Sequence, residues 1–205
     1  MISLILTALA CAPAQDPKPS EVFASWSFRP EGVEGDEVRD LRGKNPLRLE
    51  GGARVSAAAG PGALMFSSVA PRAVIDAGVS SSALPKKEFS AEAWVTIDKA
   101  QPWGAIITAM QDNGGFEKGW LLGYVNDKFC LGLSTEGVDD GDGLMTYITG
   151  KTPFRSGRWY HVVATYDGKL TRIYVNGQLD VESEQQHGAI NYPANLFFEV
   201  GSYHD

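Results

Sequence analysis

The sequence has 205 residues, of which 43% are hydrophobic, and this is enough apolar surface for a folded core and argues against a disordered chain. Its net charge of −7, with no cluster of Lys or Arg, argues against nucleic acid and anionic membrane surfaces as partners. Once an N-terminal leader is set aside, about 185 residues remain, which is one domain for an all-β sandwich.

The first 21 residues differ in composition from the rest. Residues 1–14 are apolar and end in small side chains, and they are too few for a bilayer-spanning helix, which needs about 20 residues. We therefore predict a signal peptide at 1–14 and an exported protein, in the periplasm, at the cell surface or secreted. The alternative is a lipoprotein-type signal peptide, in which Cys11 carries a lipid anchor. Residues 15–21, with Pro17 and Pro19, are predicted to be a Pro-rich spacer.

From residue 22 onward, short runs of β-branched and aromatic residues alternate with turns rich in Gly and Pro. No long apolar stripe of helical period and no internal repeat occurs. The spacing predicts two antiparallel sheets packed face to face. Before the centre of the domain, the predicted strands are 21–29, 46–55 with a break at Gly51-Gly52, 63–67, 73–76, 89–97, 105–110, 119–125, 128–134 and 147–149.

The strongest local pattern runs from 157 to 180. Residues 159–166 have the composition of a buried strand, and Asp167-Gly168 supplies a turn. Residues 170–175 then alternate between the two faces of a strand, and Asn176-Gly177 is the pair best suited to a type I′ turn. The pattern predicts two consecutive hairpins.

The same stretch carries a family resemblance. Trp-Tyr-His-Val-Val-Ala-Thr-Tyr-Asp-Gly at 159–168, followed by Arg-Ile-Tyr-Val-Asn-Gly at 172–177, resembles the central hairpin of laminin-G-like, concanavalin A-like lectin and glucanase domains. Residues 63–66 and 89–95 match the same family. The resemblance covers 22–205 and implies an all-β, two-sheet antiparallel jelly-roll sandwich. It also implies a closing strand that has no counterpart after residues 196–201, so we expect the jelly roll at 22–205 to lack that strand and to expose an edge that pairs with another chain.

One acidic loop is a candidate metal site. Asp139, Asp140 and Asp142 share one loop with Gly141 and Gly143, and hard oxygen donors on a sharply turning chain suit Ca²⁺. The resemblance implies calcium at a loop rim beside the ligand site. The alternative is a solvated acidic turn.

Exposed aromatic side chains are the candidates for ligand binding, because sugar rings stack on Trp and Tyr faces. We predict Trp103, Phe116, Trp120 and Tyr124 as the ligand-binding residues; Trp120 and Tyr124 share one face of a strand. The other tryptophans, Trp26, Trp94 and Trp159, are predicted to pack in the core.

Catalytic residues are not predicted. Asp180, Glu182 and Glu184 alternate like the paired carboxylates of laminarinase-type hydrolases, but they follow a turn directly and are better explained as a solvent-facing strand end. The three histidines lack the spacing of a zinc site. Cys130 is left unpaired and is predicted to be a small buried strand residue.

The sequence therefore predicts an exported module that binds an extracellular glycan or glycoconjugate and has no catalytic activity of its own. Two alternatives stay open. One is the N-terminal accessory domain of a longer secreted hydrolase, namely a phosphoesterase, sulfatase or glycosidase. The other is an adhesion module that binds protein through a flat apolar patch.

Overall fold

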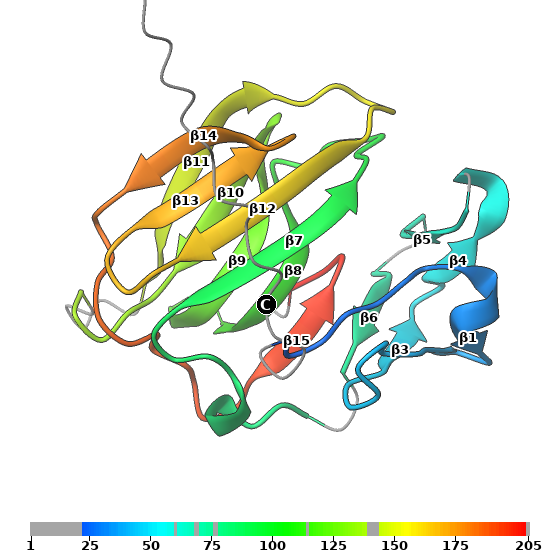
Figure 1. Ribbon diagram of the computed structural model, residues 1–205, viewed down its shortest axis with the longest axis horizontal. Helices are drawn as coiled ribbons and strands as arrows, with labels where there is room; N and C mark the ends of the chain where they lie inside the picture. Colours follow the sequence, from blue (N-terminus) through cyan, green and yellow to red (C-terminus); the bar gives the residue numbers. More distant parts are fainter. Residues whose placement is uncertain are drawn as a thin grey trace, which may run out of the picture.

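The computed structural model describes residues 22–59, 61–67, 70–75, 78–113, 115–138 and 144–203. The predicted signal peptide and spacer, and the candidate calcium ligands Asp139, Asp140 and Asp142, lie outside these residues. Within them the chain forms two antiparallel sheets packed face to face, with a separate short hairpin, as Figure 1 shows. The predicted all-β sandwich is confirmed. No helix in the described part of the chain has the length and apolar character needed to cross a membrane.

In the described residues the larger sheet has nine strands, in the order β1-β2-β3-β6-β15-β8-β9-β10-β11. Its neighbouring strands are antiparallel throughout. Their bounds are β1 (Val33–Glu34), β2 (Glu37–Val38), β3 (Leu47–Glu50), β6 (Arg72–Val74), β15 (Phe197–Val200), β8 (Trp103–Asp112), β9 (Glu117–Val125), β10 (Lys128–Leu133) and β11 (Thr146–Pro153).

The smaller sheet has four strands among the described residues, in the order β14-β13-β12-β7, and covers one face of the larger sheet (Figure 1). These are β14 (Gln178–Ser183), β13 (Thr171–Val175), β12 (Tyr160–Tyr166) and β7 (Phe89–Val95). The separate hairpin is β4 (Arg54–Ser56) with β5 (Ala63–Met65), and the short 3-10 turns are η2 (Pro30–Gly32), η3 (Ala57–Ala59) and η4 (Ser81–Ala83).

The two predicted central hairpins are present as β12-β13-β14. Buried and half-buried residues alternate strictly along β12 and β13, as a strand with one face on a core requires. Asn176 and Gly177 both have positive φ, 51° and 78°, which is the type I′ geometry predicted for this pair. The first turn is longer than predicted, because the Asp167 carboxylate accepts hydrogen bonds from the amides of Lys169 and Leu170.

The main core lies between the sheets and is rich in aromatic rings. Phe89 of the smaller sheet stacks on Trp120 of the larger one, with ring centroids 4.7 Å apart. Phe129 and Tyr160 meet edge to face across the same interface at 5.6 Å. Because successive residues of a strand point to opposite faces, only every second residue of β9 and β10 reaches this core.

The alternate residues of β8, β9 and β10 form a second, smaller apolar layer on the outer face of the larger sheet. Met110, Leu121, Cys130 and Met145 are buried there. Burial raises the pKa of the Cys130 thiol to about 12, so it stays protonated at neutral pH. Cys130 is a small buried residue of β10, as the sequence predicts.

The predicted first strand, 21–29, is wrong. Between residues 22 and 29 the described backbone makes a single bridge, from Trp26 to Asp40. The Phe23 and Trp26 rings still reach the core, where they pack on Phe198 with centroids 5.6 and 5.9 Å away. The backbone is bonded to side chains of a neighbouring loop, since Asn45 donates to the carbonyl of Phe23.

Asp40 organises that loop. Its buried carboxylate accepts hydrogen bonds from the amides of Ser25, Arg42, Lys44 and Asn45, at 2.9 to 3.1 Å. Burial by itself raises the pKa of the Asp40 carboxyl, but the four amide donors outweigh burial and hold the pKa below its usual value. The charged form of Asp40 therefore stabilises the folded state.

We expect Asp40→Ala to lower the free energy of unfolding by about 3 kcal/mol at neutral pH, because buried amides lose a charged acceptor. Because the pKa of Asp40 is lower in the folded state than in the unfolded state, its carboxylate stabilises the fold above the unfolded pKa of about 3.9. This stabilisation is lost as the pH falls through the folded pKa. Urea unfolding at several pH values checks this. The difference in free energy of unfolding between wild type and variant should narrow toward pH 3. A difference that does not change with pH would contradict this role of Asp40.

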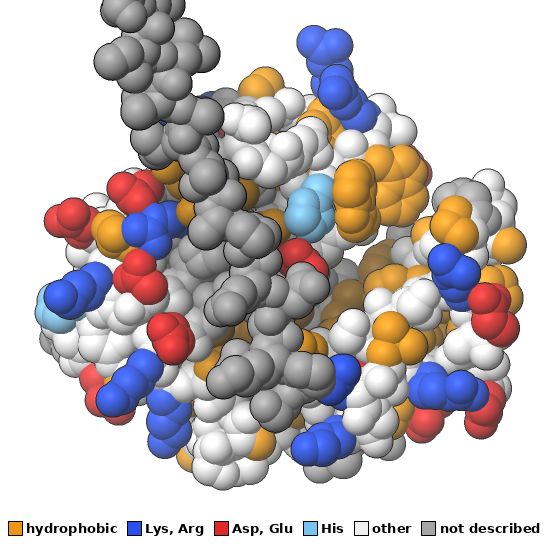
Figure 2. Space-filling view, in the orientation of Figure 1, with side chains coloured by type: hydrophobic (Ala, Val, Ile, Leu, Met, Phe, Trp, Pro, Cys, Tyr) orange, Lys and Arg blue, Asp and Glu red, His pale blue; other side chains and the backbone are white. Residues whose placement is uncertain are grey.

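Two tryptophans predicted to be in the core are exposed: Trp94 on the outer face of the smaller sheet, and Trp159 directly before β12. Trp94 is 67% exposed and Trp159 is 40% exposed. The Trp94 ring stacks on His161, with centroids 5.2 Å apart, and His161 is within 3.3 Å of the Glu92 carboxylate. Figure 2 looks onto this face and shows apolar side chains exposed among charged ones. The prediction failed because Trp94 shares a face with Glu92, whereas the core face carries Phe89 and Ala91.

Candidate functional site

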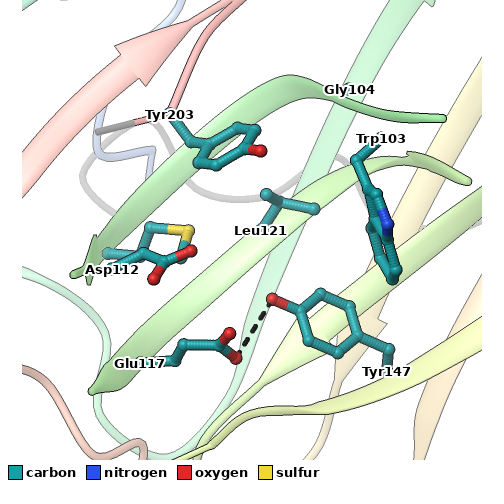
Figure 3. A pocket seen from close by; sticks show the side chains of 8 residues that line it. Trp103, Gly104, Asp112, Glu117, Leu121, Tyr147 and Tyr203 are labelled. Carbon is teal, nitrogen blue, oxygen red and sulfur yellow. Dashed lines mark hydrogen bonds between the residues drawn. The ribbon is translucent and has the colours of Figure 1, made fainter. Parts of the chain in front are cut away.

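A groove of about 250 Å³ lies on the outer face of the larger sheet, against the second apolar layer. Strands β8, β9 and β11 supply most of its walls, and the segment that follows β15 closes one side (Figure 3). The lining residues are Trp103, Gly104, Met110, Asp112, Glu117, Leu121, Tyr147 and Tyr203.

Two aromatic rings form one wall of the groove. Trp103 is the first residue of β8 and is 50% exposed. Its ring meets Tyr147 edge to face at an interplanar angle of 69°, with centroids 5.3 Å apart. Tyr147 lies opposite Gly132 in the β10-β11 pair, and a Cβ on Gly132 would come within 2.6 Å of the tyrosine ring. Glycine at this position therefore allows the ring to lie close against the sheet.

Two carboxylates form the other end. Asp112 and Glu117 are directly opposite each other at the end of the β8-β9 hairpin, so both side chains are on the same face. One Glu117 oxygen accepts hydrogen bonds from the Tyr147 hydroxyl at 3.3 Å and from the Met145 amide at 3.0 Å. Figure 3 shows the carboxylates on one side of Leu121 and the Trp103-Tyr147 wall on the other.

The electrostatics of the groove are negative. Burial raises the pKa of the Tyr147 hydroxyl well above its usual value, and the charges of Glu117 and Asp112 raise it further. Tyr147 is therefore a neutral hydrogen-bond donor at any physiological pH. The groove offers aromatic faces, an apolar floor and two oxygen acceptors, which is the composition of a small-molecule binding site.

The structure places the four predicted ligand-binding residues in three different environments. Trp103 lines the groove. Phe116 is half-buried in the turn of the β8-β9 hairpin, with the Lys118 ammonium 5.2 Å from its ring centroid, and it is outside the groove lining.

Trp120 and Tyr124 share a face, as predicted, but that face is buried between the sheets. Their exposed fractions are 5% and 9%. The Trp120 indole donates a hydrogen bond to the Tyr192 hydroxyl at 3.1 Å, and the Tyr124 ring packs edge-on against Phe154 at 5.4 Å. Both side chains are part of the core and lie on the opposite side of β9 from the groove, so we remove them from the candidate site.

Sequence reasoning missed Glu117, Tyr147 and Tyr203 as groove residues. Asn113-Gly114-Gly115 is a turn signal in the sequence, and a hairpin centred on it would have placed Asp112 opposite Glu117. Tyr203 comes from a segment far away in the chain, and no local pattern points to its place in the groove.

The acidic pattern after the Asn176-Gly177 turn is structural. The Asp180 carboxylate accepts hydrogen bonds from the amides of Lys151 and Thr152, at 2.8 and 3.0 Å, and so joins the edge strands of the two sheets. Glu182 pairs with Arg172 across β13 and β14. Among the residues that the structure describes, no group of three or more His, Cys, Asp or Glu side chains could hold a metal ion.

Comparison with known proteins relates this architecture to a recognised family. A protein-family model described as "Concanavalin A-like lectin/glucanases superfamily" matches residues 74–203. Pappalysin-1 of Mus musculus is 28% identical over 121 residues, which is 54% of this chain and 7% of that protein. The chain thus corresponds to a small part of the length of this relative.

Solved structures share the fold. The binding domain of Paraclostridial mosquitocidal protein 1 superposes with a TM-score of 0.61 at 15% identity, over 83% of this chain and 44% of that one. Domain 4 of AbnA, a GH43 extracellular arabinanase from Geobacillus stearothermophilus, is in complex with arabinotriose and superposes with a TM-score of 0.59 at 13% identity. That superposition covers 81% of this chain and 78% of that one.

Proposed function

The chain belongs to the concanavalin A-like lectin/glucanase superfamily, and from this premise we propose that it is a non-catalytic module that binds carbohydrate in the groove on its larger sheet. The observation that carries the proposal is the edge-to-face pairing of Trp103 and Tyr147 beside two carboxylates. Aromatic faces stack on the C–H faces of sugar rings, and carboxylate oxygens accept hydrogen bonds from sugar hydroxyls.

The geometry suits a short stretch of a glycan. A groove of about 250 Å³ is smaller than a typical drug-sized pocket, so one or two sugar rings are the expected occupants. The complex of the AbnA domain with arabinotriose supports a sugar as the kind of ligand that this fold can hold. Export of the protein, and calcium binding by Asp139, Asp140 and Asp142, stay predictions of the sequence.

A second function is compatible with the same groove. Because the chain matches 7% of the length of pappalysin-1, domains of this kind occur within much longer proteins. An accessory role beside a catalytic domain would use the groove to hold the substrate of that domain. The groove itself is expected to bind without hydrolysis.

Trp103→Ala tests the proposal. We expect the variant to lose at least about tenfold in affinity for a polysaccharide that the wild type retains, because the stacking surface is removed. Affinity gel electrophoresis against a panel of plant, bacterial and animal polysaccharides is the measurement.

Trp94→Ala is the matched control, since Trp94 is also exposed but lies on the smaller sheet. Its affinity should equal that of the wild type. Retention on none of the polysaccharides, or an equal loss in the two variants, would contradict binding in the groove.

A further inference from the structure

The charged side chains that line the groove are all acidic. Asp112 and Glu117 are carboxylates, and the other lining residues are aromatic, aliphatic or glycine. Glu117 is held in place by the Tyr147 hydroxyl and the Met145 amide, so its charge is fixed at one end of the groove. A ligand that enters therefore meets negative potential together with aromatic faces.

Asp112 and Glu117 are a pair of like charges directly opposite each other on β8 and β9. Like charges directly opposite on neighbouring strands destabilise a sheet. Elsewhere the larger sheet places Glu50 opposite Arg72, with 2.6 Å between the charged atoms. The smaller sheet likewise places Arg172 opposite Glu182.

One other pair of like charges faces across strands in the described residues, and its setting differs. Glu34 is opposite Glu37 in the short β1-β2 pair, where the Glu34 side chain is 79% exposed and bonded to Arg39. Solvent and a cation relieve repulsion there. Asp112 and Glu117 both line a groove that is also walled by aromatic rings.

Rings and carboxylates together favour an organic cation. The face of an aromatic ring attracts an ammonium group, most strongly for Trp. Among the described residues no group of three or more His, Cys, Asp or Glu side chains could hold a metal ion here, and Trp103, Leu121 and Met110 supply no oxygen ligand. An anionic sugar would be repelled by both carboxylates.

We infer that the groove selects sugars that carry a free amino group, with the protonated amine between Asp112, Glu117 and the rings of Trp103 and Tyr147. This inference rests on the proposed function of the groove. It predicts that amino sugars bind best, neutral and N-acetylated sugars bind more weakly, and uronic acids bind least.

Isothermal titration calorimetry of the full chain tests the inference with four probes of equal length: oligomers of glucosamine, N-acetylglucosamine, glucose and galacturonic acid. At mildly acidic pH the amines and the uronic acids are both charged. We expect the glucosamine oligomer to bind at least about tenfold more tightly than the N-acetylglucosamine oligomer. The difference should shrink as salt is raised, because salt screens the charges.

Glu117→Gln is the decisive variant, since the amide oxygen of Gln can still accept from the Tyr147 hydroxyl and the Met145 amide. It should lose most of the preference for glucosamine and keep the affinity for neutral oligomers. Glu92→Gln, on the opposite sheet, should change neither.

The other outcomes distinguish selectivity for amino sugars from carbohydrate binding in general. Equal affinities for glucosamine and glucose oligomers would overturn the amino-sugar inference and leave carbohydrate binding intact. Binding of none of the four probes would count against both. If titration of the wild type with calcium alone produces heat, and Glu117→Gln abolishes that heat, the carboxylates bind a metal and the inference is overturned.

Discussion

Replacing Trp120 by alanine is expected to lower the free energy of unfolding by about 3–5 kcal/mol, the usual cost of removing a large aromatic side chain from a core. The Trp120 ring stacks on Phe89 at 4.7 Å and meets Phe198 edge-on at 6.1 Å, so the substitution leaves a cavity between the two sheets. It also removes the indole donor to the Tyr192 hydroxyl, 3.1 Å away.

Trp103→Ala is the matched comparison, because it removes the same side chain from a half-exposed position. Its cost should stay below about 1 kcal/mol. Urea unfolding of both variants measures the difference, and the melting temperature of Trp120→Ala should fall by about 10 °C. If Trp120→Ala were as stable as wild type but lost glycan binding, Trp120 would belong to a ligand site and the position of the core would be wrong.

Gly119→Ala is expected to cost at least about 3 kcal/mol, because two separate penalties add. The φ of Gly119 is +106°, a conformation that side chains other than glycine rarely adopt. A Cβ at this position would also lie 2.1 Å from the carbonyl oxygen of Ala109 and 2.9 Å from the Cα of Met110. Backbone atoms on β8 cannot move aside as a flexible side chain would, so the β8-β9 pair must open.

Gly177→Ala separates the two penalties. Gly177 also has a positive φ, +78°, but a Cβ there would meet nothing within 4 Å. Only the conformational penalty applies, about 1–2 kcal/mol. Thermal unfolding of both variants, together with glycan binding by the folded fraction, checks the comparison. Equal costs for the two substitutions would show that the close approach of β8 and β9 at Gly119 is absent in solution.

Local sequence patterns determined the class of the fold and most of its strands. The hairpins of β12, β13 and β14 follow from strict alternation and from Asn176-Gly177, because period-2 patterning and turn chemistry act over a few residues. The interruption at Gly51-Gly52 correctly separates β3 from β4. The prediction for residues 21–29 failed because the Asp40 carboxylate and the Asn45 amide, far along the chain, bond to backbone that a strand partner would otherwise bind.

Tertiary structure alone decided which side of each strand faces solvent and which residues meet at the groove. Alternation shows that Trp120 and Tyr124 share a face, but the same alternation fits either side of a sheet that is apolar on both. The smaller sheet covers the face of β9 that carries Trp120, whereas Trp103 lies on the uncovered face of the larger sheet. Trp94, which the sequence suggested was buried, is exposed on the outer face of the smaller sheet. Asp112, Glu117, Tyr147 and Tyr203 converge only through strand register and the path of the chain after β15, because contacts between distant segments depend on packing and not on local pattern.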